Sequence, residues 1–214
     1  MAVRRRDENA EATRAALLAA ARRAFAANGF GGADVGAIAA EAGVTTGAIY
    51  HHFDSKKGLF QAVAEAIEME ILARAETGAG ELSWRFLTTA FANMIDLCAA
   101  PDIQRIIFVE GSQVLGPETW RELEARYAIG AVTGVLTHLM ETGVVRRAPI
   151  ELVARLMLAI LREASAEVAR TSGDAAARAE VARLTDGFLE TLLASGEAKP
   201  APWLARTPPS GSAR

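Results

Sequence analysis

The chain has 214 residues and a formal net charge of −3 at pH 7, which argues against an indiscriminate nucleic-acid binder. Hydrophobic residues make up 51% of it and aromatic residues only 6%, a composition that favours packed amphipathic helices over strands. Its single cysteine, Cys98, excludes an intramolecular disulfide framework and a cysteine-based zinc site, so we expect a protein of the reducing cytoplasm.

The N-terminal segment MAVRRRDENAEATR has no apolar stretch after its arginines, so we expect no signal peptide. No run of about eighteen uncharged apolar residues occurs, so we expect no membrane-spanning helix.

Apolar spacing in the first quarter of the chain predicts a helix over about residues 9–28, ended by a left-handed turn at Asn28-Gly29. A second helix is expected to begin at the N-cap Asp34 and to break at Gly43. A third begins after Thr45. Two helices of about eight residues joined at a glycine are typical of a helix-turn-helix.

Asp54 or Ser55 is predicted to cap a fourth helix, which runs toward the glycine-containing segment ETGAGE. Beyond that segment the sequence predicts five further helices, over about residues 82–99, 102–114, 117–141, 149–171 and 174–194. The predicted fold is all-α, with about nine helices. Its expected parts are a flexible arm at 1–8, a helix-turn-helix domain at 9–54, a connecting helix at 55–77, a larger helical domain at 78–195 and a disordered tail at 196–214.

The segment TRAALLAAARRAFAANGFGGADVGAIAAEAGVTTGAIYHHFDSKKGLFQAV resembles the N-terminal domain of the tetracycline-repressor (TetR) family of transcription regulators. The resemblance covers residues 13–63, and the rest of the chain matches only in its plan of five helices. It implies a homodimer on a roughly palindromic DNA operator, most simply a repressor released by a small effector that binds in residues 78–195. It implies no enzymatic activity and no cofactor.

The resemblance also implies which residues contact DNA. Thr46 and Gly47 would face base edges in the major groove, where a missing Cβ lets the backbone approach the bases. Contacts to phosphates would come from four residues, Thr45, Tyr50, His51 and Lys56. One departure is the pair Ala33-Asp34, because relatives usually carry Thr or Ser there and an Asp repels phosphate.

Neighbouring histidines at positions 51 and 52 raise the alternatives of a metal site or a neutral surface. Side chains of adjacent helical residues point about 100° apart and do not easily converge on one metal, unlike an i, i+4 pair. We therefore expect His51 to donate to a phosphate and His52 to support the fold, with no metal bound.

Two helix faces in the C-terminal region mix aromatic, polar and small residues, as a pocket for a small, largely apolar effector requires. The alternative is that the first face, with Trp84 and Met94, is ordinary core, and that the small residues of the second only allow close helix contact. The candidate effector-binding residues are Trp84, Phe91, Met94, Trp120, Glu124, Tyr127, Gly134 and His138.

The last two helices are predicted to form the dimer interface, because the helix over 149–171 is apolar on two sides and so has two partners to bury against. A monomeric core is the alternative. The candidate interface residues are Leu152, Leu156, Ala159, Val181, Leu184, Phe188 and Leu192.

A competing hypothesis is a helical enzyme that uses His138 with Glu141 or Glu163. No third ligand, nucleophile elbow or glycine-rich phosphate loop accompanies these residues, so the regulator is the favoured interpretation.

Overall fold

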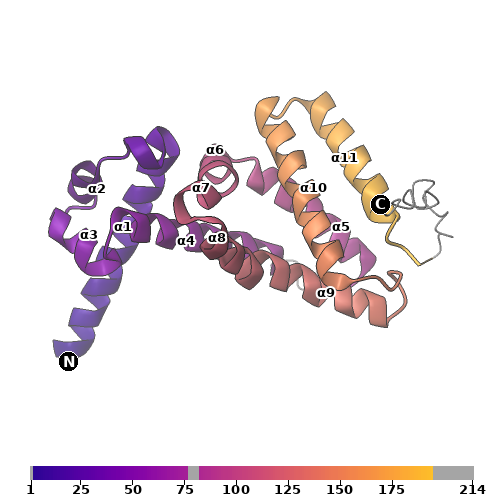
Figure 1. The fold of residues 1–214 in the computed structure, drawn as a ribbon, viewed down its shortest axis with the longest axis horizontal. Helices are drawn as coiled ribbons and strands as arrows, with labels where there is room; N and C mark the ends of the chain where they lie inside the picture. Colours follow the sequence, from indigo (N-terminus) through magenta and orange to yellow (C-terminus); the bar gives the residue numbers. More distant parts are fainter. Residues whose placement is uncertain (1, 77–81, 195–214) are drawn as a thin grey trace, which may run out of the picture.

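The computed structural model describes residues 2–76 and 82–194, with side chains described for 9–75 and 82–194. The regular elements in these ranges are helices, and Figure 1 shows their arrangement. Their bounds are α1 Ala2–Gly32, α2 Val35–Glu41, α3 Thr46–Phe53, α4 Lys56–Glu76, α5 Trp84–Cys98, α6 Pro101–Ile103, η1 Gln104–Glu110, α7 Gly111–Leu115, α8 Pro117–Glu124, η2 Ala125–Ile129, α9 Gly130–Glu141, α10 Ile150–Arg170 and α11 Ala175–Glu190.

Two of the longer rods change helix type along their length. The segments α6, η1 and α7 follow one another without a break, as do α8, η2 and α9, and both η segments are π-helical. Counted as continuous rods, the described ranges contain nine helices. The all-α prediction is confirmed, and the boundary segment at 77–81 and the predicted tail at 196–214 lie outside the described residues.

Helix α1 begins at Ala2, so the backbone of residues 2–8 is helical where the sequence predicted an arm. Arg, Glu and Ala are good helix formers and extend the helix without an apolar stripe of their own. The predicted end is confirmed, because Gly29 has a φ of +70° and interrupts the helical backbone before Phe30.

The N-terminal helices pack on an aromatic cluster formed by Phe25, Phe30 and Phe60. The ring of Phe60 meets the other two edge-on, at centroid distances of 5.1 and 5.5 Å. Because Phe60 belongs to α4, this helix closes the bundle of α1, α2 and α3 from one end and continues into the second half of the molecule (Figure 1).

The N-termini of α2 and α4 are capped by side chains at the predicted positions. The Asp34 carboxylate accepts a hydrogen bond from the Ala37 N–H at 2.7 Å, and the Ser55 hydroxyl accepts one from the Gly58 N–H at 3.0 Å. Ser55, rather than Asp54, therefore caps α4, while Asp54 takes a positive φ of +61° in the turn.

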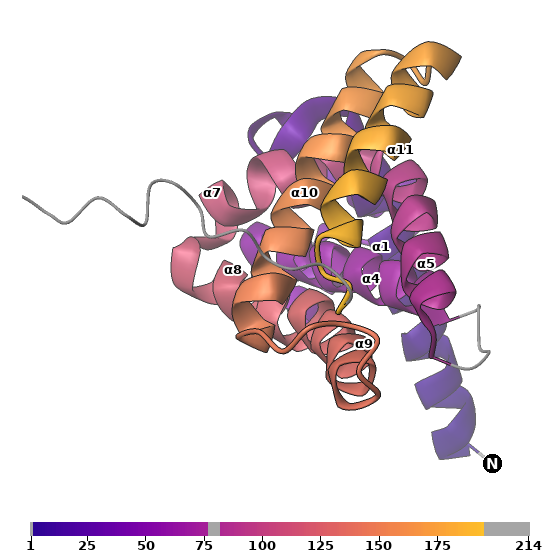
Figure 2. The same cartoon turned by 90° about the vertical axis from the view of Figure 1, so that its right-hand side faces the viewer.

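Helices α5, α10 and α11 lie side by side in the C-terminal half (Figure 2), where α10 contacts both of the others. The rod α8–η2–α9 crosses beneath them and contacts α4 and α10 through η2. Within the described ranges, no helix is long and apolar enough to cross a membrane.

The angle between α3 and α4 depends on Gly58, whose importance the sequence did not reveal. A Cβ added there would overlap the backbone carbonyl oxygen of Phe53, at the C-terminal end of α3. Since a backbone atom cannot move aside cheaply, only glycine lets the two helices meet this closely.

We expect Gly58→Ala to lower the free energy of unfolding by about 1–3 kcal/mol, because overlap with backbone must be relieved by a shift of α3 or α4. Gly134→Ala is the matched control, since a Cβ at this exposed helical position has nothing within 4 Å. The control should raise stability by about 0.4–1 kcal/mol. Denaturant unfolding at fixed protein concentration measures both, and a Gly58→Ala variant as stable as the parent would contradict this account.

Candidate nucleic-acid interface

Helix α3 has one buried face and one exposed polar face. Ile49 and Phe53 are buried in the bundle core, four residues apart. The opposite face is exposed and carries five of the six predicted DNA contacts: Thr45, Thr46, Gly47, Tyr50 and His51. The polar residues of α3 are therefore not needed to hold the helix in place.

At the start of α3, the hydroxyl group of Thr45 and the backbone of Gly47 are accessible from outside the protein. Thr45 occupies the N-cap position, but its side chain makes no capping hydrogen bond. The nearest atom to a Cβ added at Gly47 would be the Thr45 hydroxyl oxygen, 3.7 Å away, so packing within the protein does not require glycine there. An external surface that approaches the backbone closely would require it.

Lys56, the sixth predicted contact, is only partly exposed. Its ammonium nitrogen lies 5.0 Å from the ring centroid of Phe30, within cation–π range. Its neighbour Lys57 is exposed, and sequence reasoning did not select it. A sequence pattern does not distinguish two adjacent lysines, because the packing of Phe30 against α4 decides which one is covered.

The two histidines have different surroundings. His51 is exposed, whereas His52 is partly buried with its ring centroid 6.0 Å from that of Phe53. This agrees with a supporting role for His52. Across residues 9–75 and 82–194 no group of three or more His, Cys, Asp or Glu side chains is placed to hold a metal ion.

The exposed face of α3 belongs to a helix-turn-helix, and the segment that contains this motif matches a family model. The model described as "Bacterial regulatory proteins, tetR family" matches residues 17–63. A second, described as "Tetracyclin repressor-like, C-terminal domain", matches residues 84–192, about half of the chain. The chain belongs to the TetR family of DNA-binding transcriptional regulators.

Individual relatives agree with this assignment. The probable HTH-type transcriptional regulator ArpR of Pseudomonas putida is 44% identical over 82 residues, which cover 37% of this chain and 39% of that protein. The repressor BepR of Brucella suis is 32% identical over 109 residues, which cover 50% and 52%. A TetR-family regulator from Pectobacterium atrosepticum has a solved structure that superposes with a TM-score of 0.69 at 30% identity, over 91% of this chain and 98% of that one.

TetR-family proteins are transcription factors and not enzymes, so the alternative based on His138 with Glu141 or Glu163 is set aside.

Two side chains of the π-helical segment η1 form hydrogen bonds with the backbone near the C-terminal end of α1. One guanidinium nitrogen of Arg105 donates to the backbone carbonyls of Ala26 and Ala27, each at 2.8 Å. The Glu110 carboxylate accepts from the backbone N–H of Phe30 at 2.7 Å and sits where a Cβ at Gly29 would otherwise be. We call this set of contacts, from Arg105 and Glu110 to the end of α1, the η1 clamp.

A network of ion pairs lies beside the η1 clamp. Arg22 on α1 donates to Asp102 on α6 at 2.7 Å and to Glu70 on α4 at 2.6 Å. Its guanidinium is about a third exposed, so the pairs position the helices more than they add stability. Together with the η1 clamp, they couple α1 to the first rod of the C-terminal half.

The eight candidate effector residues have different environments. Trp120 is buried, and one edge of its ring packs against Gly111 of α7, where an added side chain would overlap it. Gly134 is exposed with nothing within 4 Å of an added Cβ, so no other helix of the chain packs closely against it. Phe91 and Met94 are buried in the core; the remaining four, Trp84, Glu124, Tyr127 and His138, are partly buried.

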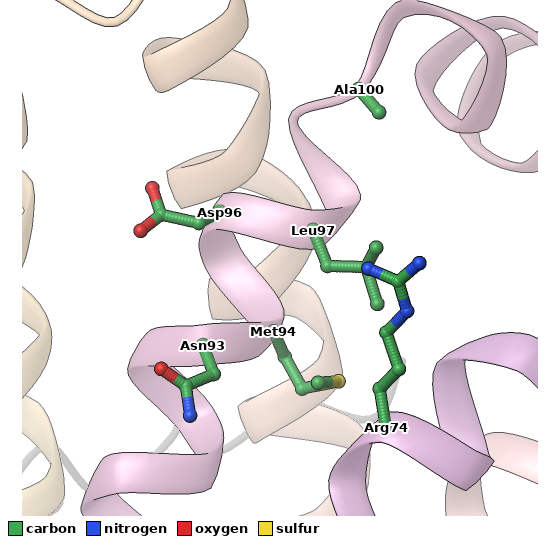
Figure 3. Close-up of a pocket in the computed structure, with 6 residues that line it drawn as sticks. All are labelled: Arg74, Asn93, Met94, Asp96, Leu97 and Ala100. Atoms are coloured by element: carbon green, nitrogen blue, oxygen red, sulfur yellow. The ribbon is translucent and has the colours of Figure 1, made fainter.

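An open hollow of about 510 Å³ lies between α4 and α5 (Figure 3). Figure 3 shows Arg74 reaching from α4 toward Leu97 of α5, while Asp96, which pairs with Arg178 of α11, points away from it. Of the eight candidate effector residues, Met94 is among the residues that line this hollow and the other seven are not, so the hollow does not unite them in one pocket.

Glu68 is a buried carboxyl that sequence reasoning missed. It lies on α4 four residues after Ala64 and eight after Phe60, so it continues their buried face, and it is 5% exposed. Burial, and secondarily the charge of Glu124, raises its pKa to about 7. The spacing of four and eight residues from two apolar positions was the available signal. It is hard to recognise in the sequence because Glu68 lies between two other glutamates in the segment EAIEME.

The predicted dimer-interface residues divide into two groups. Five are exposed: Leu152, Leu156, Ala159, Leu184 and Phe188. Val181 is buried in the core of the protomer and Leu192 packs partly against it, so these two were wrongly assigned to an outer surface. Val181 lies on the side of α11 that faces the rest of the chain, and Leu192 lies just beyond the C-terminal end of that helix.

We expect His51→Ala to weaken binding to operator and to scrambled duplex by the same factor, about tenfold, because a phosphate contact carries no sequence information. Thr46 substitutions should instead change which duplex is preferred. Fluorescence anisotropy with both duplexes measures this, and His138→Ala, a histidine of α9, is the control. Unchanged affinity in His51→Ala would refute the phosphate contact.

The raised pKa of Glu68 makes stability depend on pH. The folded state holds this proton between about pH 4.5 and 7 while the unfolded state loses it, so stability should fall as pH rises through that window, by up to about 3 kcal/mol. Glu68→Gln should flatten the pH profile of the unfolding free energy, and Glu65→Gln, on the same helix, should not. Parallel profiles for the parent and Glu68→Gln would contradict the assignment.

Proposed function

We propose that the protein is a repressor that binds a palindromic operator as a homodimer and is released by a small, largely apolar effector. The observation that carries the DNA-binding part is the exposed polar face of α3, whose threonines, tyrosine and histidine have no packing role. The repressor part is supported by one relative, BepR, which is named a transcriptional repressor.

The dimer is supported by an apolar surface on α10 and α11. Leu156 is 55% exposed and Phe188 57%, and Leu152 and Leu184 are nearly as exposed. These two helices lie side by side (Figure 2), so a two-fold axis would join the four helices of two protomers into a bundle. Such a dimer would present two α3 helices to successive major grooves.

Release by an effector requires that the C-terminal half moves the helix-turn-helix. The η1 clamp supplies a route, because any displacement of η1 pulls on the carbonyls of Ala26 and Ala27 and on the N–H of Phe30. An effector that favours a displaced η1 would change the spacing of the two α3 helices in the dimer, and operator affinity would fall.

We expect the protein to bind DNA taken from immediately upstream of its own gene more tightly than scrambled duplex, with two protomers per site. Fluorescence anisotropy across a salt series measures affinity, and its salt slope reports phosphate contacts. Equal, weak binding to both duplexes would contradict a local operator, and the exposed carboxylate of Asp34 at the start of α2 would then be the first position to substitute.

The dimer is tested in the same assay with Leu156→Glu, which places a charge in the apolar surface. This variant should sediment as a monomer and lose operator binding. Met69→Glu is the control, because Met69 is 58% exposed on α4, outside that surface. A dimeric Leu156→Glu variant with full operator affinity would rule out this interface.

A further inference from the structure

Glu68 is an ionisable side chain that is buried without a hydrogen-bond or ion-pair partner among the described residues. Only 5% of the residue is exposed, and none of the hydrogen bonds or ion pairs within residues 9–75 and 82–194 involves its carboxyl group. Yet no side-chain oxygen in this part of the chain is both fully enclosed and unbonded. The oxygens of Glu68 must therefore retain contact with a space that a small polar group can reach.

Two further groups come near this carboxyl from other elements. Glu124, at the end of α8, and the thiol of Cys98, at the end of α5, both interact electrostatically with Glu68. Burial raises the pKa of the Cys98 thiol to about 12, so the thiol stays neutral and adds no charge to this region. Two carboxyl groups from two helices thus lie near each other, Glu68 buried and Glu124 partly exposed.

Aromatic surface accompanies the second carboxyl. Trp120 precedes Glu124 by four residues on α8, which places the two side chains on one face of that helix. Tyr127, three residues after Glu124 in η2, is partly buried against the core. Aromatic rings next to carboxylates are the surroundings that bind ammonium groups.

We propose that Glu68, with Glu124, receives the positively charged end of the effector, which is an apolar molecule that carries a protonated amine or a quaternary ammonium. This inference rests on the proposed function, since it names the chemical class of the ligand that the regulator detects.

Charge balance distinguishes this class from the others. An anion would be repelled by both carboxyl groups. A neutral ligand would leave Glu68 either protonated or ionised without a counter-charge, so it would gain no charge interaction at this position. A metal ion would need more ligands than the described side chains bring together here. A ligand that brings its own positive charge and an apolar body satisfies both carboxyl groups and the surrounding core.

Cation binding should release a proton. The pKa of Glu68 is raised by burial and by the charge of Glu124, the other ionisable carboxyl that bears on it, so part of the protein holds a proton there at neutral pH. An ammonium beside the carboxyl favours its charged form and lowers this pKa again. Below about pH 7 the uptake of the cation should therefore be accompanied by the release of up to one proton.

A set of three probes with one skeleton tests the charge. The amine 4-phenylbutylamine is a cation at pH 7, 4-phenylbutanol is neutral and 4-phenylbutanoate is an anion. Isothermal titration of the full-length protein should show the amine binding at least tenfold more tightly than the alcohol, with the anion weakest. Titration at pH 6 in two buffers of different ionisation enthalpy should show proton release for the amine alone.

Glu68→Gln should remove the preference for the amine and the proton release, and it should fold, because an uncharged side chain suits the buried position. Glu65→Gln is the matched control on the same helix and should leave both unchanged. The inference is overturned if none of the probes binds, if amine and alcohol bind equally, or if Glu68→Gln binds the amine as tightly as the parent.

Operator binding by the same variants separates this inference from the proposed function. If the parent binds operator but shows no preference for the amine, the regulator stands and the cationic effector is refuted. If the amine binds through Glu68 but neither duplex is bound specifically, the site stands and the proposed repressor is refuted. If both hold, the amine should lower operator affinity in the parent and not in Glu68→Gln.

Discussion

The η1 clamp is the constraint on which the relation between the two halves depends. The helical backbone of α1 is interrupted at Gly29, and such a break leaves backbone groups that need other hydrogen-bond partners. Arg105 covers the carbonyls of Ala26 and Ala27, and Glu110 accepts from the N–H of the residue after the glycine. The helix-turn-helix is therefore completed by side chains of the C-terminal half, and neither half has an independent boundary at this point.

This arrangement explains how one small domain can be rigid and still respond. The aromatic cluster of Phe25, Phe30 and Phe60 fixes α4 against α1, and the absence of a side chain at Gly58 lets α3 pack closely on α4. The polar face of α3 takes no part in either contact. Substitutions on that face should therefore cost little stability, while the η1 clamp holds the whole unit against the C-terminal half.

The C-terminal half retains one feature that lowers stability, the carboxyl group of Glu68 that packs against it. Because its pKa is raised to about 7, the carboxyl of Glu68 makes the folded state less stable at neutral pH than at about pH 4.5. Functional sites commonly retain such unfavourable groups where a ligand later compensates them. In the proposed function, the cationic end of the effector would complete the buried carboxyl, and a second protomer would cover the exposed apolar surface of α10 and α11.

The sequence by itself determined the features that depend on local contacts. The helix end at Gly29, the cap at Asp34, the polar face of α3 and the all-α class follow from hydrogen bonds and spacings within a few residues, and the structure has them. Only the tertiary structure decided what lies between helices. Burial of Glu68 and Val181, the exposure of Gly134 and the need for glycine at position 58 each depend on an element distant in sequence or on the angle between two helices, and apolar spacing along one helix does not specify which neighbour covers which face.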